Sequence, residues 1–269
     1  MNAPERLLLP LPDIQSQPDH RAIAIDRVGI RGLRHPIKVT TASGVAVATI
    51  AMVDMSVALP AALKGTHMSR FLEVLQAHEG EFSVAALPGL MRAMLGRLEA
   101  STGTLSLRFP YFVMKRAPVS GVESLMDYEM CLRAKGGASD IEIALEVGVP
   151  VTSLCPCSKE ISAYGAHNQR SVVTISATLD APLDPEELIA MAERAASCEL
   201  YGLLKRPDEK YVTERAYDNP KFVEDLVRDV ALDLERDPRV AAYLVTSENF
   251  ESIHNHSAYA AIERYKRAA

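Results

Sequence analysis

The sequence contains no tryptophan, only four cysteines and few aromatic residues, which make up 6% of the chain. Small secreted domains held together by disulfides need far more cysteine, so we expect reduced thiols and a cytoplasmic protein. The leucine run at 7–9 is short and followed by proline, which is unlike a secretion signal. No segment approaches the ~20 consecutive apolar residues of a membrane-spanning helix, so we expect no membrane partner.

A dense cluster of basic residues is also missing. The formal net charge is −6 at pH 7, and without a basic stripe to follow a phosphate backbone we expect no nucleic-acid partner. A few local lysine and arginine side chains are still compatible with a small anionic ligand. The 269 residues, of which 48% are hydrophobic, are enough to bury the core of one large domain or of two ordinary ones.

The hydrophobic pattern predicts a repeated order of secondary structure. Apolar residues that alternate with polar ones predict strands, and apolar residues three or four positions apart predict helices. By this criterion residues 21–136 have the order β-β-α-α-β-β, and residues 137–269 have the same order. Residues 1–20, which are interrupted by prolines, are expected to form either an extended N-terminal arm or a disordered terminus. We therefore expect an α+β fold of two tandem modules, each an antiparallel sheet with two helices on one face.

The expected elements have the following bounds. The strands are expected at 23–39, 45–59, 104–115, 124–134, 141–151, 171–179, 240–245 and from about 254. The helices are expected to begin near Thr66, Pro88, Asp184 and Asn219. Asp184 is followed by proline and then, at the third position, by Glu187, which is the pattern of a capped helix start. We expect that helix to run to about Leu204 and residues 205–214 to form a loop.

Chemistry-bearing residues concentrate in residues 152–171, TSLCPCSKEISAYGAHNQRS, which are expected to form a long loop leading into a strand. Cys155 and Cys157 flank a proline, and His167 follows twelve positions after Cys155. A thiolate and an imidazole are common ligands of zinc. Two other interpretations stay open: a buried thiol beside a hydrogen-bonding histidine, and a cysteine nucleophile activated by a neighbouring base.

The other two cysteines argue against a closed metal cage. Cys131 and Cys198 lie in apolar strand and helix patterns, so we expect both to be core residues. A catalytic site with three protein ligands and an open position therefore fits better than a structural zinc site with four. Candidates for the third ligand are Asp208, Glu209 and Glu214, although most acids in such a loop are merely solvated.

A second cluster of titratable residues lies near the C-terminus. Glu251, His254 and His256 follow one another closely, and the two histidines share a face if their stretch is extended. A histidine backed by a carboxylate is a good general acid or base near neutral pH. The alternative is a strand end that simply faces solvent.

These motifs together resemble one family. SLCPCSKEIS followed by YGAHNQRS is similar to the core motif of GTP cyclohydrolase I of the type IB class. The resemblance extends through RHPI at 34–37, PDEKYVTE at 207–214 and ENFESIHNHSAYA at 248–260, so it covers nearly the whole chain. It implies two tunnelling-fold (T-fold) modules in one chain and a homotetramer with active sites between subunits. It also implies an enzyme of folate and pterin biosynthesis that opens the imidazole ring of GTP, releases C8 as formate and forms 7,8-dihydroneopterin triphosphate.

The resemblance assigns roles to individual residues. Its metal ligands fall on Cys155, His167 and Glu209, and the carboxylate that holds the guanine edge falls on Glu224. The metal is one divalent ion per site, and this mixed ligand set is compatible with zinc, manganese or iron. The residues that support acid and base chemistry fall on Glu251 and His254. Cys157 matches the second thiol of the motif.

Two rival functions stay open at this point. One is a T-fold nitrile reductase with a cysteine nucleophile and a nicotinamide cofactor, although the sequence has no glycine-rich dinucleotide motif. The other is a non-catalytic purine- or pterin-binding protein with a structural metal. Periodicity also gives Glu224 a rival interpretation, because it lies beyond the apolar stripe of its expected helix and reads as a solvated acid.

Overall fold

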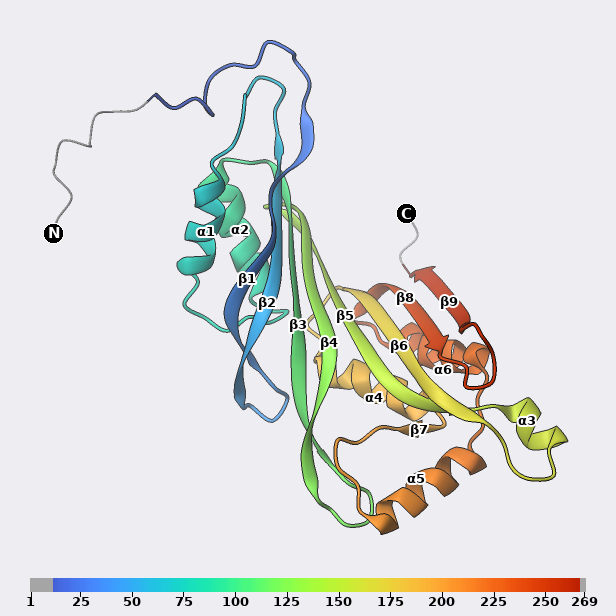
Figure 1. Cartoon of the computed structure of the whole chain (residues 1–269). Helices are drawn as coiled ribbons and strands as arrows, with labels where there is room; N and C mark the ends of the chain where they lie inside the picture. Colours follow the sequence, from blue (N-terminus) through green and yellow to red (C-terminus); the bar gives the residue numbers. More distant parts are fainter. Residues whose placement is uncertain (1–11, 267–269) are drawn as a thin grey trace.

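In the computed structural model, which describes residues 12–266, the strands form a single antiparallel sheet (Figure 1). Nine strands are found in this part of the chain, with β1 to β6, β8 and β9 side by side in that order and β7 paired to β5. The strands are β1 (Ile25–Thr40), β2 (Ala46–Leu59), β3 (Thr102–Arg116), β4 (Glu123–Gly137), β5 (Asp140–Leu154), β6 (Asn168–Leu179), β7 (Cys198–Glu199), β8 (Val240–Asn249) and β9 (Ala258–Tyr265).

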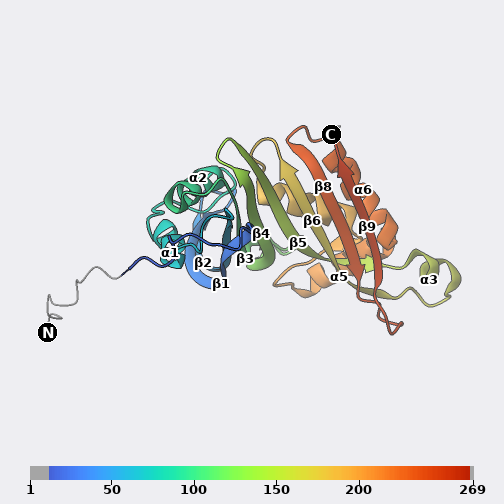
Figure 2. The ribbon, with the colours of Figure 1, turned by 90° about the horizontal axis from the view of Figure 1, so that it is seen from above.

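The described residues form six helices, most of which pack on one face of this sheet. They are α1 (Met68–Gln76), α2 (Leu87–Leu98), α3 (Pro156–Ile161), α4 (Pro185–Ala195), α5 (Arg206–Asp218) and α6 (Val223–Arg236). From above, α1 and α2 lie beside β1 to β4, and α6 lies along β8 and β9 (Figure 2). The expected α+β class with an antiparallel sheet is confirmed. No helix in residues 12–266 is long and apolar enough to cross a membrane.

The alternating strand pattern explains which face is covered. On β3 the side chains of Leu105, Leu107 and Phe109 are almost completely buried under the helices, and the intervening Ser106 and Arg108 point to the opposite face. Successive side chains on a strand alternate between faces, so an apolar residue at every second position builds one continuous core. The buried side chains of both halves belong to one hydrophobic cluster.

The two halves are joined directly through the sheet. The expected break near Gly136 is a tight hairpin, in which β4 turns into β5 and Gly137 pairs with Asp140. Gly136 has φ +128, and a Cβ there would lie 2.0 Å from the carbonyl oxygen of Asp140, so only glycine fits. Each half keeps the expected order β-β-α-α-β-β, but α3, β7 and α5 are additional elements of the second half.

Two predictions around residues 195–218 were wrong. The helix that begins after Asp184 ends at Ala195 rather than near Leu204, because Cys198 and Glu199 pair with β5 as the short strand β7. Residues 206–218 form α5 rather than a loop. This helix buries little apolar surface, so its sequence lacks the stripe that reveals an amphipathic helix.

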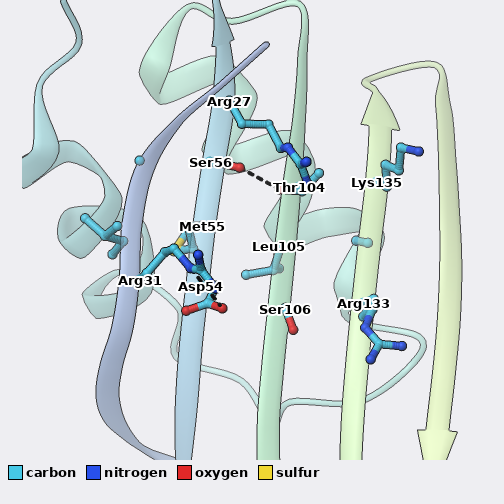
Figure 3. Close-up of a pocket in the computed structure, with 13 residues that line it drawn as sticks. Arg27, Arg31, Asp54, Met55, Ser56, Thr104, Leu105, Ser106, Arg133 and Lys135 are labelled. Atoms are coloured by element: carbon cyan, nitrogen blue, oxygen red, sulfur yellow. Dashed lines mark hydrogen bonds and ion pairs between the residues drawn. The ribbon is translucent and has the colours of Figure 1, made fainter. Parts of the chain in front are cut away.

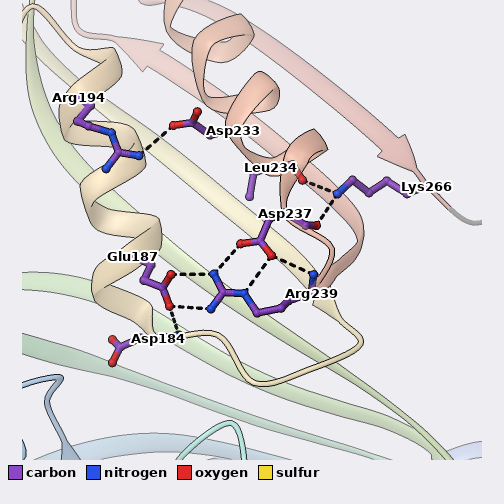
Figure 4. A network of polar contacts seen from close by, with 8 residues as sticks. All are labelled: Asp184, Glu187, Arg194, Asp233, Leu234, Asp237, Arg239 and Lys266. Atoms are coloured by element: carbon purple, nitrogen blue, oxygen red, sulfur yellow. Dashed lines mark hydrogen bonds and ion pairs between the residues drawn. The ribbon is translucent and has the colours of Figure 1, made fainter.

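The second half is tied together by a polar network around Arg239 (Figure 4). The Arg239 guanidinium donates to both carboxylate oxygens of Glu187 on α4, at 2.9 and 2.7 Å, and to both of Asp237 after α6, at 3.0 and 2.7 Å. Hydrogen bonds from Arg239 therefore lower the pKa of both carboxyl groups. Lys266 donates to the carbonyl oxygens of Leu234 and Asp237, at the C-terminal end of α6. This network fixes α6, whose first turn carries Glu224.

A buried polar cluster joins β3 and β4 to α4. The Lys115 ammonium donates to Glu193 at 2.6 Å, and the Tyr128 hydroxyl donates to the same carboxylate oxygen at 2.8 Å. The Tyr111 hydroxyl donates to Glu186 at 3.0 Å. These contacts link residues of the first half to a helix of the second, so the halves are held by polar contacts as well as by the shared sheet.

The N-terminal arm is described from residue 12 onward, and the part at 1–11 lies outside the described residues. Residues 12–20 have no regular structure, but they are hydrogen-bonded to the segment after β2. The backbone N–H of Asp19 donates to the Ala62 carbonyl at 3.0 Å, and the N–H of Lys64 donates to the Gln17 carbonyl at 3.0 Å. This part of the arm therefore packs against the chain.

Candidate active site

A cavity of about 290 Å³ lies where α3, β6, α6 and the loop from β8 to β9 meet. Six of the residues singled out from the sequence line it, although they come from four separate segments. They are Cys155, His167, Glu224, Glu251, His254 and His256. Gln169, Asn249 and Lys221 also contribute to its wall. The structure thus brings together most of the candidate residues in one place.

Hydrogen bonds close the loop that carries the thiol and the imidazole. Cys155 is the N-cap of α3, and its sulfur accepts from the backbone N–H of Ser158 at 3.4 Å. The backbone N–H of Cys155 donates to the His167 carbonyl at 3.1 Å. The N–H of His167 in turn donates to the Ser158 hydroxyl at 3.2 Å. Residues twelve positions apart in the sequence are therefore adjacent at the mouth of the loop.

Two side chains contact the imidazole of His167 at its Nδ1 atom. Its Nδ1 lies 3.0 Å from Oε1 of Gln169 and 3.9 Å from a carboxylate oxygen of Glu251. The side chains of His167 and Glu251 are 13% and 12% exposed, so this contact is largely shielded from solvent. With Nδ1 engaged, Nε2 is the nitrogen left for a ligand.

The hydrophobic periodicity of the helix was not sufficient to predict the surroundings of Glu224. It lies in the first turn of α6 and is exposed, as expected for a position beyond the apolar stripe. The same position makes it part of the cavity wall. Lys221, a cation in that wall, donates to Asp229 at 2.7 Å, so it does not neutralise Glu224. The Glu224 carboxylate is therefore available to accept hydrogen bonds.

The two histidines of the β8–β9 loop lie together. The rings of His254 and His256 are stacked, with centroids 5.2 Å apart and planes 14° apart. Both residues are exposed, and both line the cavity. The stretch is not extended as the shared face required, because residues 252–256 form a bend and β9 begins at Ala258 rather than near His254. The two rings lie together by stacking.

Two of the candidate residues do not line this cavity. Cys157 is exposed on α3. Glu209 is exposed in the first turn of α5, whose last turn contacts α3 through a hydrogen bond from Lys159 to the Tyr217 carbonyl. Eight residues separate Glu209 from Tyr217, which is about 12 Å along a helix axis. Within residues 12–266, no three His, Cys, Asp or Glu side chains are close enough to hold a metal ion.

The structure separates Glu209 from the other two acids of its segment. The Asp208 carboxylate is completely buried and accepts hydrogen bonds from the N–H groups of Val119, Ser120 and Lys205, each at 2.8 Å. The Ser120 hydroxyl donates to it as well, at 2.6 Å. Glu214 pairs with Lys210 at 2.6 Å. Asp208 is thus a structural anchor of α5. The Glu209 carboxylate has no hydrogen bond or ion pair among the described residues.

The remaining cysteines are core residues, as expected. Cys131 and Cys198 are 2% and 1% exposed, and burial raises the pKa of the Cys198 thiol. Cys198 lies in β7 rather than in a helix. All four cysteines lie within the described residues and are free thiols.

A larger cavity, of about 640 Å³, lies on the uncovered face of β1 to β4 (Figure 3). Its wall carries Arg27, Arg31, Arg133 and Lys135. Arg31 lies 3.9 Å from Asp54, and Arg133 pairs with Glu146 at 2.8 Å. The wall contains neither cysteine nor histidine, so it does not offer the donor set found beside α3.

Sequence reasoning missed three polar residues of the site, which are Lys221, Gln169 and Asn249. Gln169 and Asn249 are 8% and 3% exposed, on the strands that flank the cavity. The sequence did contain a signal for such residues, which is a polar residue at a position of a strand that otherwise faces the apolar core. For Gln169, the alternation of Ser171, Val173 and Ile175 placed it on the inward face.

The donor set fits a divalent ion. A thiol and an imidazole, which are soft and borderline ligands, face one cavity, and the second ring nitrogen of the histidine already has a partner. Glu224 and Glu251 line the same cavity, but within the described residues no third side chain lies close enough to complete a metal site. Such a combination suits zinc, manganese or iron better than magnesium or calcium, which prefer oxygen ligands alone.

The sheet, its helices and this cavity define an α+β protein of the architecture found in urate oxidases. The urate oxidase of Bacillus subtilis 168 superimposes with a TM-score of 0.51 at 10% sequence identity, covering 89% of this chain and 98% of that one. The uricase of Arthrobacter globiformis superimposes with a TM-score of 0.52 at 9% identity, covering 91% and 95%. At such low identity this likeness describes the fold alone.

The chain belongs to the type I GTP cyclohydrolase FolE2 family, whose sequence model matches residues 11–260. It is 58% identical over 270 residues to the GTP cyclohydrolase FolE2 of Azoarcus sp. (strain BH72), covering 99% of both chains. It is 61% identical over 257 residues to the GTP cyclohydrolase FolE2 of Herminiimonas arsenicoxydans, covering 96% of this chain and 98% of the relative. The resemblance seen in the motifs is therefore confirmed at the level of the family.

Proposed function

We propose that this chain opens the imidazole ring of GTP by hydrolysis, releases C8 as formate and forms 7,8-dihydroneopterin triphosphate for folate and pterin biosynthesis. Family membership over residues 11–260 supports the activity, and the cavity that gathers Cys155, His167 and Glu224 is the observation that supports the site. Neither a nitrile reductase nor a non-catalytic binding protein is favoured by any contact in this cavity. We also propose that the enzyme is of the type IB class. Its fold then consists of two T-fold modules, and its location is the cytoplasm.

In this proposal Cys155 and His167 hold one divalent ion, which is zinc, manganese or iron. A bound divalent ion lowers the pKa of water and so supplies a nucleophile at neutral pH. His167 binds through the ring nitrogen that Gln169 does not contact.

The other residues of the cavity bind the substrate and move protons. Guanine presents its N1–H and its exocyclic amine side by side, and a single carboxylate such as Glu224 accepts from both. Adenine has no such pair of donors, so Glu224 also discriminates between the bases. His254 carries protons as the C–N bonds break, and Glu251 orients the imidazole of His167 and supports this transfer. Cys157 lies two positions after Cys155, on α3 and outside the cavity wall. In this proposal it assists the hydrolysis of GTP.

The third ligand, Glu209, comes from a second copy of the chain in this proposal. Glu209 is exposed at the end of α5 that lies away from α3. It does not line the cavity that Cys155 and His167 of the same chain form. The outer strands of the sheet, β1 and β9, each pair on one side only within the described residues. Open sheet edges favour association with further strands. A homotetramer with sites between copies satisfies both observations, and light scattering of the active enzyme tests it.

Metal content and formate release are the direct test of the site. Cys155→Ala, His167→Ala and Glu209→Ala are each expected to lose bound metal and GTP turnover while the fold, checked by circular dichroism, is retained. Glu214→Ala is the matched control, since it removes an exposed acid from the same helix. Full metal occupancy with normal turnover in Cys155→Ala would refute the metal site.

A mixing experiment tests the origin of Glu209. Cys155→Ala and Glu209→Ala proteins are each expected to be inactive, but unfolding and refolding them together should restore activity. In a mixed pair, one site then combines an intact Cys155 from one copy with an intact Glu209 from the other. If both ligands came from the same chain, every site in the mixture would contain one substitution and no activity would return.

A further inference from the structure

A row of buried polar side chains runs behind His167, away from the cavity. Gln169 is 8% exposed, and Ser153 and Ser171 are completely buried. Ser153 faces Gln169 across the β5–β6 pair, so the amide lies directly over the serine. Gln169 Nε2 donates to the Ser153 hydroxyl at 3.2 Å, and the Ser153 and Ser171 hydroxyls are 2.6 Å apart. Buried polar groups need partners, and here each one has the next as its partner.

In this row the amide oxygen of Gln169, and not its nitrogen, meets the imidazole. An amide nitrogen only donates and an amide oxygen only accepts. Because Nε2 of Gln169 donates to Ser153, its Oε1 faces His167 Nδ1 at 3.0 Å and must accept. Nδ1 therefore carries the hydrogen, and Nε2 of His167 keeps its lone pair.

Glu251 supports the same tautomer. Its carboxylate oxygen lies 3.9 Å from the same Nδ1. A carboxylate is attracted to an N–H and repelled by a lone pair, so two acceptors on this side both favour a hydrogen on Nδ1. The opposite tautomer would place its hydrogen on Nε2, the nitrogen that a metal ion needs to find unprotonated.

We propose that Gln169 is a positioning residue, which holds His167 in the Nδ1–H tautomer and so prepares Nε2 as a metal ligand before any ion binds. This inference rests on the proposed metal role of His167 and deepens it. Histidine ligands usually donate their second ring N–H to a carboxylate or carbonyl oxygen, and loss of that partner typically weakens metal binding ~10 to 100-fold. Here the acceptor is a neutral amide whose nitrogen donates to a buried serine.

The tautomer is measured directly by two-bond ¹H–¹⁵N spectra of the metal-free protein, at a pH where His167 is neutral. We expect the Nδ1–H pattern in the native protein and a gain of the Nε2–H pattern in Gln169→Leu. An Nε2–H pattern in the native protein would overturn the proposal. This measurement needs no metal, so its outcome does not depend on whether the metal site itself is correct.

Metal affinity is the second measurement, using Zn²⁺ alone in competition with a chromophoric chelator. Gln169→Leu is expected to bind Zn²⁺ ~10 to 100-fold more weakly than the native chain. Gln169→Glu keeps an acceptor for Nδ1–H and should restore the affinity, which a purely structural role of the amide would not predict. Asn168→Ala is the control, because this exposed neighbour does not line the cavity.

Each outcome is informative. Native affinity in Gln169→Leu, or affinity in Gln169→Glu as weak as in the leucine variant, would overturn the positioning role. Failure of the native protein to bind Zn²⁺, together with an Nδ1–H tautomer, would instead refute the proposed metal site and leave the role of Gln169 in tautomer selection intact. If Gln169→Leu does not fold, Ser153→Ala is used in its place, because it removes the hydroxyl that orients the amide.

Discussion

Replacing Asp208 with asparagine is expected to destabilise the protein by about 2 to 4 kcal/mol at pH 7. The carboxylate accepts four hydrogen bonds, from the N–H groups of Val119, Ser120 and Lys205 and from the Ser120 hydroxyl. An asparagine oxygen in place of Oδ1 keeps the first two. The new NH₂ group then faces two donors. The bond from the Lys205 N–H is lost, and the Ser120 hydroxyl keeps its contact only by turning to accept from the NH₂ group.

The magnitude follows from that loss and from the loss of charge. A buried donor left without an acceptor costs roughly 1 to 3 kcal/mol, and hydrogen bonds to a charged group are about twice as strong as those between neutral groups. The three surviving bonds are therefore weakened as well. These contributions are not additive, which places the expected total below their sum.

The pH dependence gives this prediction a second test. Burial acts to raise the pKa of Asp208, but hydrogen bonds from Ser120, Lys205 and Val119 outweigh it and hold the pKa well below its ordinary value. A carboxyl group with a lowered folded-state pKa stabilises the fold above its unfolded pKa of ~3.9, and this stabilisation is lost as the pH falls through the folded pKa. The difference between native and Asp208→Asn protein should be constant above pH 5 and shrink below pH ~4.

Urea unfolding at fixed protein concentration, repeated across this pH range, measures the difference. Glu214→Gln is the control, because it alters an exposed acid on the same helix whose pair with Lys210 contributes at most ~0.5 kcal/mol. A loss below ~0.5 kcal/mol in Asp208→Asn, or a difference that changes between pH 6 and 8, would refute the anchoring role of this carboxylate.

Three further outcomes are expected. Glu224→Ala should lower kcat/KM for GTP at least ~100-fold without changing metal content, since two charged hydrogen bonds of roughly 1.5 kcal/mol or more are lost; near-normal turnover would show that this helix position is only solvated. Arg239→Ala should lower stability by about 1 to 2 kcal/mol in thermal unfolding, a modest loss because its side chain is 33% exposed, and an unchanged midpoint would contradict the bridge to Glu187 and Asp237. Cys157→Ala should lose part of its GTP turnover, whereas full activity would remove this thiol from the reaction.

Most strands and helices could be predicted because their apolar residues follow a local period. The residues Leu105, Leu107 and Phe109 of β3 and the stripe of α6 are of this kind. The end of α4 could not be predicted in this way, because the apolar period continues to Leu204 and the competing β7–β5 pairing is a long-range contact. Helix α5 was missed for the opposite reason, since only Asp208 and Ala216 are buried on it.

The same distinction applies to the candidate site. The motif identified Cys155 and His167, and the hydrogen bonds that close their loop are local. The contact of Gln169 with Ser153 was not predictable, because it depends on the register of two strands that are paired at long range. The contribution of a second chain stays a proposal, which the resemblance suggested, since a sequence pattern contains no information on contacts between copies.

Asp208 and Glu209 show how two neighbouring carboxylates acquire different roles from their surroundings. Asp208 could bind an ion only by giving up four hydrogen bonds, whereas Glu209 is exposed and keeps its lone pairs. The buried acid holds the first turn of α5 against the β3–β4 turn, and the exposed acid projects from that same turn. If Glu209 ligates the ion of a second copy, its position is set by Asp208. Asp208→Asn should then lower metal affinity as well as stability, although Asp208 itself never contacts the metal.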